Sequence, residues 1–121
     1  MLIEMDCFAS RGGVDLINPN VKQGFTSLAS NSTVTVATTQ KPRYVIVQQS
    51  RTSLTPIVSM TLLFDIENEK LIRLISKSDN TYDYIDENGT YSNFMTSVTS
   101  TSLTLKNATG GVATGYIVVY Y

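Results

Sequence analysis

The chain has 121 residues and a formal net charge of −1, and it contains no histidine and a single cysteine. The length fits one domain, and the charge balance argues against a nucleic-acid interface, which needs clustered lysine and arginine. The missing imidazole removes the usual base of a Ser or Cys triad, so we predict a protein that is not an enzyme and uses no catalytic residue, cofactor or metal.

Residues 1–23 are predicted to form a docking arm or edge strand ahead of a compact domain at residues 24–121. The segment is rich in turn residues, among them Gly12, Gly13 and Pro19. It has too many apolar residues for a free tail, so we expect them to be buried on the domain or on another molecule. These residues are Leu2, Ile3, Met5, Phe8, Val14, Leu16 and Ile17.

Two strands are predicted next, at residues 32–38 and 43–50. The first alternates valine with threonine, which is typical of a half-buried strand. The second contains YVIV, which is apolar on both faces. It is either a central strand covered by the second sheet and by a neighbouring surface, or a strand twisted at a sandwich corner. The two strands form a hairpin or cross between sheets.

A hairpin is the strongest local prediction, at residues 56–66 and 70–78 around the polar residues 67–69. The second half could also be an amphipathic helix, because Leu71, Leu74 and Ile75 share a helical face. We prefer a strand because so short a helix without a clear N-cap would be marginal.

The remaining elements are predicted as strands at residues 81–85, 90–98, 101–107 and 113–121. A turn of the Asn-Gly type is expected at residues 86–89, and a hairpin tip at Gly110 and Gly111. The acidic residues between positions 79 and 87 could hold calcium, but their spacing favours solvated turns. The N-x-S/T triplets at Asn31, Asn88 and Asn107 are interpreted as a consequence of composition.

Eight to ten short strands separated by turns predict an all-β fold, an antiparallel β-sandwich or jelly roll. Only 16% of the residues are charged, whereas 16 are threonine and 13 are serine, so we expect hydroxyl groups to face the water. No apolar run reaches the roughly 18 residues of a membrane helix, which predicts no membrane insertion. No basic segment precedes an apolar stretch at the start, which predicts assembly in a cytoplasm.

Tyrosines suggest a binding platform around residues 82–93. Tyrosine combines a flat apolar ring with a hydroxyl, and sugar rings stack on such faces while carboxylates and amides bind the sugar hydroxyls. Ordinary packing in a β-sandwich explains the same residues and is the preferred interpretation. The candidate glycan or partner platform consists of Tyr82, Asp83, Tyr84, Tyr91 and Asn93.

Three segments resemble small β modules of bacteriophage virion proteins: TVTVATTQKPRYVIVQQS, TLLFDIENEKLIRLI and SLTLKNATGGVATGYIVVYY. In those modules a Lys-Pro-x-aromatic entry leads into an apolar strand, and a glycine followed by an aromatic residue opens the final strand. The resemblance covers residues 33–121. It is carried by Lys41, Pro42, Tyr44, Val45, Ile46, Gly115, Tyr116 and Ile117.

The resemblance implies a small accessory subunit of the virion, either a head decoration or head fibre or a tail-associated protein, bound to other capsid or tail proteins. The alternative is a module of a tail fibre or baseplate that binds a host-surface glycan or receptor. Modules of this kind commonly trimerise, so a homo-oligomer is expected, with a trimer as one form. We expect the last strand to be buried against a copy of itself, through Ile117, Val119 and Tyr121.

Overall fold

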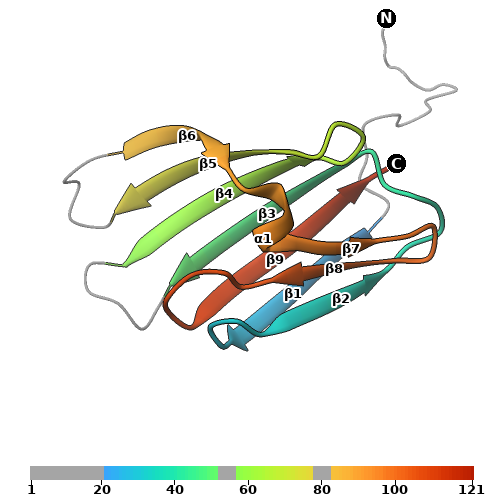
Figure 1. Ribbon diagram of the computed structural model, residues 1–121. Coiled ribbons are helices and arrows are strands. Elements are labelled where there is room, and N and C mark those ends of the chain that lie inside the picture. Colours follow the sequence, from blue (N-terminus) through green and yellow to red (C-terminus); the bar gives the residue numbers. More distant parts are fainter. Residues whose placement is uncertain (1–20, 52–56, 78–82) are drawn as a thin grey trace, which may run out of the picture.

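The computed structural model describes residues 21–51, 57–77 and 83–121, with the backbone alone for Lys77 and for residues 83–89. Two antiparallel sheets pack face to face (Figure 1), which confirms the predicted all-β sandwich. The large sheet has six strands, in the order β1 (Val21–Leu28), β9 (Ala113–Tyr120), β3 (Tyr44–Arg51), β4 (Val58–Asp65), β5 (Lys70–Lys77) and β6 (Asp83–Gly89). The small sheet has three, in the order β2 (Thr33–Ala37), β8 (Ser102–Lys106) and β7 (Met95–Val98).

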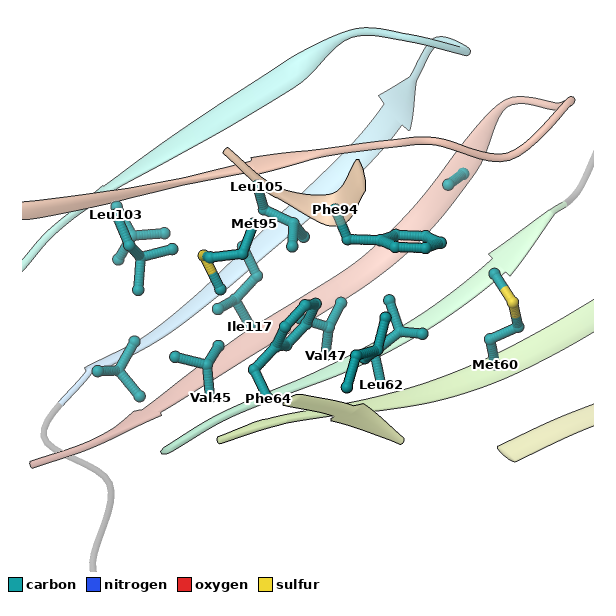
Figure 2. Close-up of a cluster of buried hydrophobic side chains, with 14 of the residues drawn as sticks. Val45, Val47, Met60, Leu62, Phe64, Phe94, Met95, Leu103, Leu105 and Ile117 are labelled. Carbon is teal, nitrogen blue, oxygen red and sulfur yellow. The ribbon is translucent and has the colours of Figure 1, made fainter. Parts of the chain in front are cut away.

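The core lies between the two sheets and is built by alternate residues of each strand. In the large sheet Val45, Leu62 and Ile117 point inward and are fully buried, and in the small sheet Leu103 and Leu105 do the same. Figure 2 shows these side chains meeting between the layers. Each such aliphatic side chain contributes roughly 1.5–3 kcal/mol by leaving water, so the alternation itself holds the sheets together.

Strand β3 contains the YVIV segment, which was predicted to be either a central strand or a strand at a sandwich corner. Val45 and Val47 point into the core with no exposed surface, whereas Tyr44 and Ile46 point to the other side of the large sheet. The strand is central, with β9 on one side and β4 on the other. The predicted central strand is therefore observed, and no other described part of the chain covers its outer side.

The predicted hairpin is confirmed as β4 and β5, paired in register from Asp65 and Lys70 at the turn. The Asp65 carboxylate accepts hydrogen bonds from the backbone N–H and the side-chain amide of Asn68, at 3.3 and 2.8 Å. Glu69 closes the turn with φ of 51°. Cross-strand pairing decides between strand and helix here, because β4 and β6 flank β5 on both sides.

The β2–β3 connection and the β8–β9 connection both cross from one sheet to the other. Strands β2 and β3 lie in different sheets, and so do β8 and β9, so the hairpin predicted around Gly110 and Gly111 is wrong. The physical reason is visible at Asn107, which follows β8 and is fully buried. Its backbone carbonyl accepts from Asn31 and its backbone N–H donates to Ser32, at 2.7 and 2.8 Å. The chain is therefore held against the β1–β2 turn instead of folding back on β8.

The arm or edge strand predicted up to residue 23 overlaps β1, which stands at the end of the six-stranded order, pairs with β9 and continues to Leu28. Two further predictions are wrong. The turn expected at residues 86–89 belongs to β6, where a bulge opposite β5 takes up an extra residue. Residues 91–94 form a short helix, α1 (Tyr91–Phe94), before β7. That change from helix to strand lets the neighbours Phe94 and Met95 both face the core, which alternation alone forbids.

Candidate assembly surface

The two sheets present different outer surfaces. On the small sheet the outward residues of β2 and β8 include Thr33, Thr35 and Thr104, as expected of a surface solvated by hydroxyl groups. Thr35 and Thr104 lie opposite each other in the ladder with their hydroxyls 3.1 Å apart. The outward side of the large sheet, called the outer face below, carries aliphatic and aromatic side chains instead.

An aliphatic row crosses the outer face perpendicular to the strands. Val118 of β9 is paired with Ile46 of β3, Ile46 with Leu63 of β4, and Leu63 with Ile72 of β5. Leu63 is 37% exposed and Ile72 is 41% exposed. Val118 is buried but lies outside the core cluster, and it is paired with Lys22 of β1 on its other side. Four in-register aliphatic residues on the exposed side of a sheet form a continuous apolar strip.

A second row runs beside the first, from Tyr116 through Gln48 and Thr61 to Leu74. Tyr116 and Leu74 are both exposed. The Lys22 ammonium lies over the Tyr116 ring, 4.7 Å from its centroid, and holds the ring at the β1 side of the face. This second row is therefore apolar at its two ends, on β9 and β5, and polar but uncharged in its middle, on β3 and β4.

Polar groups border these two rows along the strands. Beyond Tyr116 the next row contains Ser50 and Ser59, whose hydroxyls lie 3.2 Å apart. On the opposite side, Tyr44 stands beside Asp65, and Asp65 is paired with Lys70. The charged residues thus lie at the margin, which is the usual layout of a protein interface with an apolar centre and a polar rim.

Two open hollows indent the outer face. One, of about 530 Å³, lies over β1, β9 and β3, where Gly24 lacks a side chain beside its partner Tyr116, which forms part of the wall. The other, of about 490 Å³, lies over β3, β4 and β5 and is lined by Tyr44, Leu63 and other residues near the β4–β5 turn. Both are shallow enough to receive side chains of a facing protein.

The titratable groups near this face give no acid–base pair. The hydrogen bond from the Asn68 side chain is the main cause that lowers the pKa of Asp65, which keeps this exposed carboxylate ionised. Within residues 21–51, 57–77 and 83–121, no group of three or more His, Cys, Asp or Glu side chains could hold a metal. The chemistry that the outer face can perform is contact: burial of apolar area with polar groups around it.

Three of the five residues of the predicted tyrosine platform have side chains that the structure does not describe. Tyr82 lies outside the described residues, and Asp83 and Tyr84 are described by backbone alone, in β6. Tyr91 is half-buried on α1, with its ring edge-to-face against Phe64 at a centroid distance of 5.8 Å. Asn93 is exposed on the same helix. The Tyr91 ring therefore packs partly against the core, through its contact with Phe64.

The residues predicted for self-association lie inside the monomer and do not face a partner chain. Ile117 and Val119 are fully buried between the sheets. Tyr121 packs against the core, and its hydroxyl accepts a hydrogen bond from the backbone N–H of Thr39 at 3.0 Å. These side chains are occupied inside the monomer, so a partner chain would instead meet the alternate residues of β9, including Tyr116 and Val118.

The predicted docking residues from Leu2 to Ile17 lie outside the described residues. The predicted boundary after residue 23 falls inside β1, which begins at Val21. Of the outer face, only the part on β3 was predicted, from the apolar YVIV segment, although two further segments carry the same signal. The segments YVIV, LLF and LIRLI are apolar on both strand faces, which a sandwich with one solvated side does not need.

Comparison with protein-family models, curated proteins and solved structures finds no match for the chain. Among the described residues, no helix has the length and apolar character required to cross a membrane.

Proposed function

We propose that this chain is a structural subunit of a bacteriophage particle, a small accessory protein of the head or tail that docks by protein–protein contact through its outer face. The observation that carries the proposal is the in-register aliphatic row of Val118, Ile46, Leu63 and Ile72 on the exposed side of the large sheet. Contiguous apolar patches on otherwise soluble proteins mark sites of interaction.

Energetics favour assembly over any other use of this surface. Each Å² of apolar surface removed from water stabilises a complex by about 25 cal/mol before the cost of association. Leu63, Ile72 and Leu74 are each more than one third exposed, so a partner can bury most of their area. A small-molecule site would instead need an enclosed cavity with a few convergent polar groups, and both hollows here are open.

The placement on a virion is supported by the resemblance of residues 33–121 to phage β modules. Strand β3, which carries Tyr44, Val45 and Ile46 of that resemblance, also supplies the middle of the aliphatic row. One of the residues that suggest a virion module, Ile46, is thus part of the surface on which the proposed contact depends.

The test is to locate the chain on purified particles. Antiserum raised against the protein is expected to label intact virions in immunogold microscopy. A phage carrying Leu63→Lys and Ile72→Lys together should yield unlabelled particles, because two buried cations without partners oppose docking. A matched control, Thr33→Lys on the outer side of the small sheet, should keep the label. Wild-type particles that lack the protein would refute the proposal.

A further inference from the structure

We propose that the outer face is covered by a second copy of this chain, with the two large sheets packed face to face around a two-fold axis. This inference rests on the proposed function and names the partner that the outer face contacts in the particle: a second copy of the chain, so that the protein is incorporated as a dimer. Three properties of the face support it. The centre of the face is uncharged, its area matches a protein interface, and it is the one apolar outward surface among the described strands.

The centre of the outer face suits contact with itself. In a two-fold interface each residue meets the same surface patch of the other copy, so a charged centre would bring like charges together. The outward residues in the middle of β9, β3, β4 and β5 are aliphatic, aromatic, amide or hydroxyl residues without charge. Charges of both signs stand at the margin, with Lys22 on β1 and Asp65 and Lys70 at the β4–β5 turn, where opposite charges of two copies can pair.

The area is sufficient for a stable dimer. Strands β1, β9, β3, β4 and β5 each have eight residues, which span about 26 Å at roughly 3.3 Å per residue. Six strands at a spacing of about 4.8 Å give a width of about 25–29 Å, hence a face of about 700 Å². A standard protein interface uses about 800 Å² on each side, so one whole sheet face matches the requirement.

The difference between the outward surfaces of the two sheets favours a dimer over a trimer. A closed trimer needs two different complementary surfaces on every subunit, whereas a two-fold dimer needs a single self-complementary one. The described part of the small sheet turns threonines such as Thr33 and Thr35 outward. The large sheet turns its aliphatic row outward, and stacked sheets pack readily at about 10 Å through such rows. The arrangement therefore predicts a dimer.

Sedimentation velocity of the full chain, from about 1 to 100 µM, tests the proposal without any other particle component. The expected species has twice the 13.3 kDa mass of the chain. Leu63→Lys with Ile72→Lys should weaken association more than about 100-fold, because two uncompensated cations would be buried per copy. Thr33→Lys, which adds the same charge to the other sheet, should leave the dimer intact. Circular dichroism of each variant confirms that it remains folded.

Three results would overturn the proposal: a wild-type monomer at 100 µM, a trimer, or a dimer that survives the double substitution. In the monomer case, protection of Leu63 and Ile72 from hydroxyl-radical oxidation would assign the face to residues 1–20 of the same chain. Because the particle-labelling experiment is independent, a monomer that still labels virions rejects the dimer and keeps the proposed function. A dimer that is absent from virions keeps the dimer proposal and rejects the proposed function.

Discussion

Asn107 joins segments that are far apart in the sequence. Its side-chain amide donates to the carbonyls of Leu28, Ala29 and Gly111, at 2.9, 3.3 and 2.8 Å, and its carbonyl accepts from the backbone N–H of Thr109 at 3.2 Å. The residue is fully buried, so no water can replace these partners. The triplet that begins at Asn107 thus reflects a structural need for asparagine, which the sequence-based interpretation as composition missed.

Replacing Asn107 with alanine is expected to lower the free energy of unfolding by about 2–4 kcal/mol, because buried carbonyls lose their donor. Urea denaturation followed by circular dichroism measures this loss. Asn93→Ala, at an exposed position of α1, is the matched control and should change stability by less than about 0.5 kcal/mol. Equal effects at the two positions would contradict the junction role of Asn107.

Tyr91 should make the fold sensitive to alkaline pH. Burial is the main cause that raises the pKa of Tyr91 above the ordinary value of about 10, and the negative charges of Glu69 and Asp65 add to it. A phenol with a raised pKa in the folded state binds its proton more tightly there than in the unfolded chain. Its contribution to stability is therefore complete below pH 10 and is lost as the pH rises through the folded-state pKa.

Comparison of the wild type with Tyr91→Phe isolates this effect, since all other titrating groups are shared. The stability of the wild type relative to the variant should stay constant from pH 7 to 9 and fall as the pH rises above the ordinary tyrosine pKa of about 10. The measurement is urea denaturation at a series of pH values. A constant difference across the whole range would show that Tyr91 titrates alike in both states.

At the scale of elements, the pairing of β9 with β3 depends on Gly115. A Cβ atom at this position would lie 1.9 Å from the backbone oxygen of Gln48 and 2.8 Å from the Cα of Gln49. Both contacts are with backbone, which cannot rotate away as a side chain can. The glycine is therefore required by the close approach of two strands at the middle of the large sheet.

Gly115→Ala is expected to lower the free energy of unfolding by about 3 kcal/mol, at the upper end of the usual cost of overpacking. Gly110→Ala is the control, because nothing lies within 4 Å of an added Cβ there. Thermal unfolding of both variants provides the comparison. If Gly115→Ala melted with the wild type, the two strands would have to be less closely packed than the structure shows.

Local patterns predicted elements where the partner strand is near in sequence. The β4–β5 hairpin could be found because its polar turn and both apolar runs are contiguous, and β2 because valine alternates with threonine. Strand β1 could not be found, since Phe25 is its one buried side chain and Gly24 weakens the strand pattern. Its partner β9 lies about 90 residues away, and no local signal encodes that pairing.

At the scale of the whole molecule, alternation predicted two stacked layers but not how the strands divide between them. The same limit applies to the candidate site. Ile46 was recognised as apolar on a doubly apolar strand, whereas Leu63 and Ile72 become part of one surface through the register of three strands. On β9, the residues predicted to contact a partner chain are those that face the core, because a run of consecutive apolar residues does not indicate which side of the strand is buried.

The uncharged centre of the outer face makes a prediction for the assembled molecule. Raising NaCl from about 50 to 500 mM should leave the dimer dissociation constant unchanged or lower it, since screening has little to weaken. Sedimentation equilibrium at several salt concentrations measures this dependence. A severalfold weakening with salt would mean that the marginal charges of Lys22, Asp65 and Lys70, rather than the aliphatic row, supply the affinity.

The position of β9 between β1 and β3 also affects how the protein emerges from the ribosome. Among the described strands, β1 pairs only with β9. Its pairing must therefore follow the synthesis of some 85 further residues, which takes about 4–17 s at usual translation speeds of roughly 5–20 residues per second. During that interval the nascent large sheet consists of two separate pieces, and Phe25 lacks its native neighbours. Chaperones that recognise nascent chains should therefore encounter β1 first and release it only when β9 arrives.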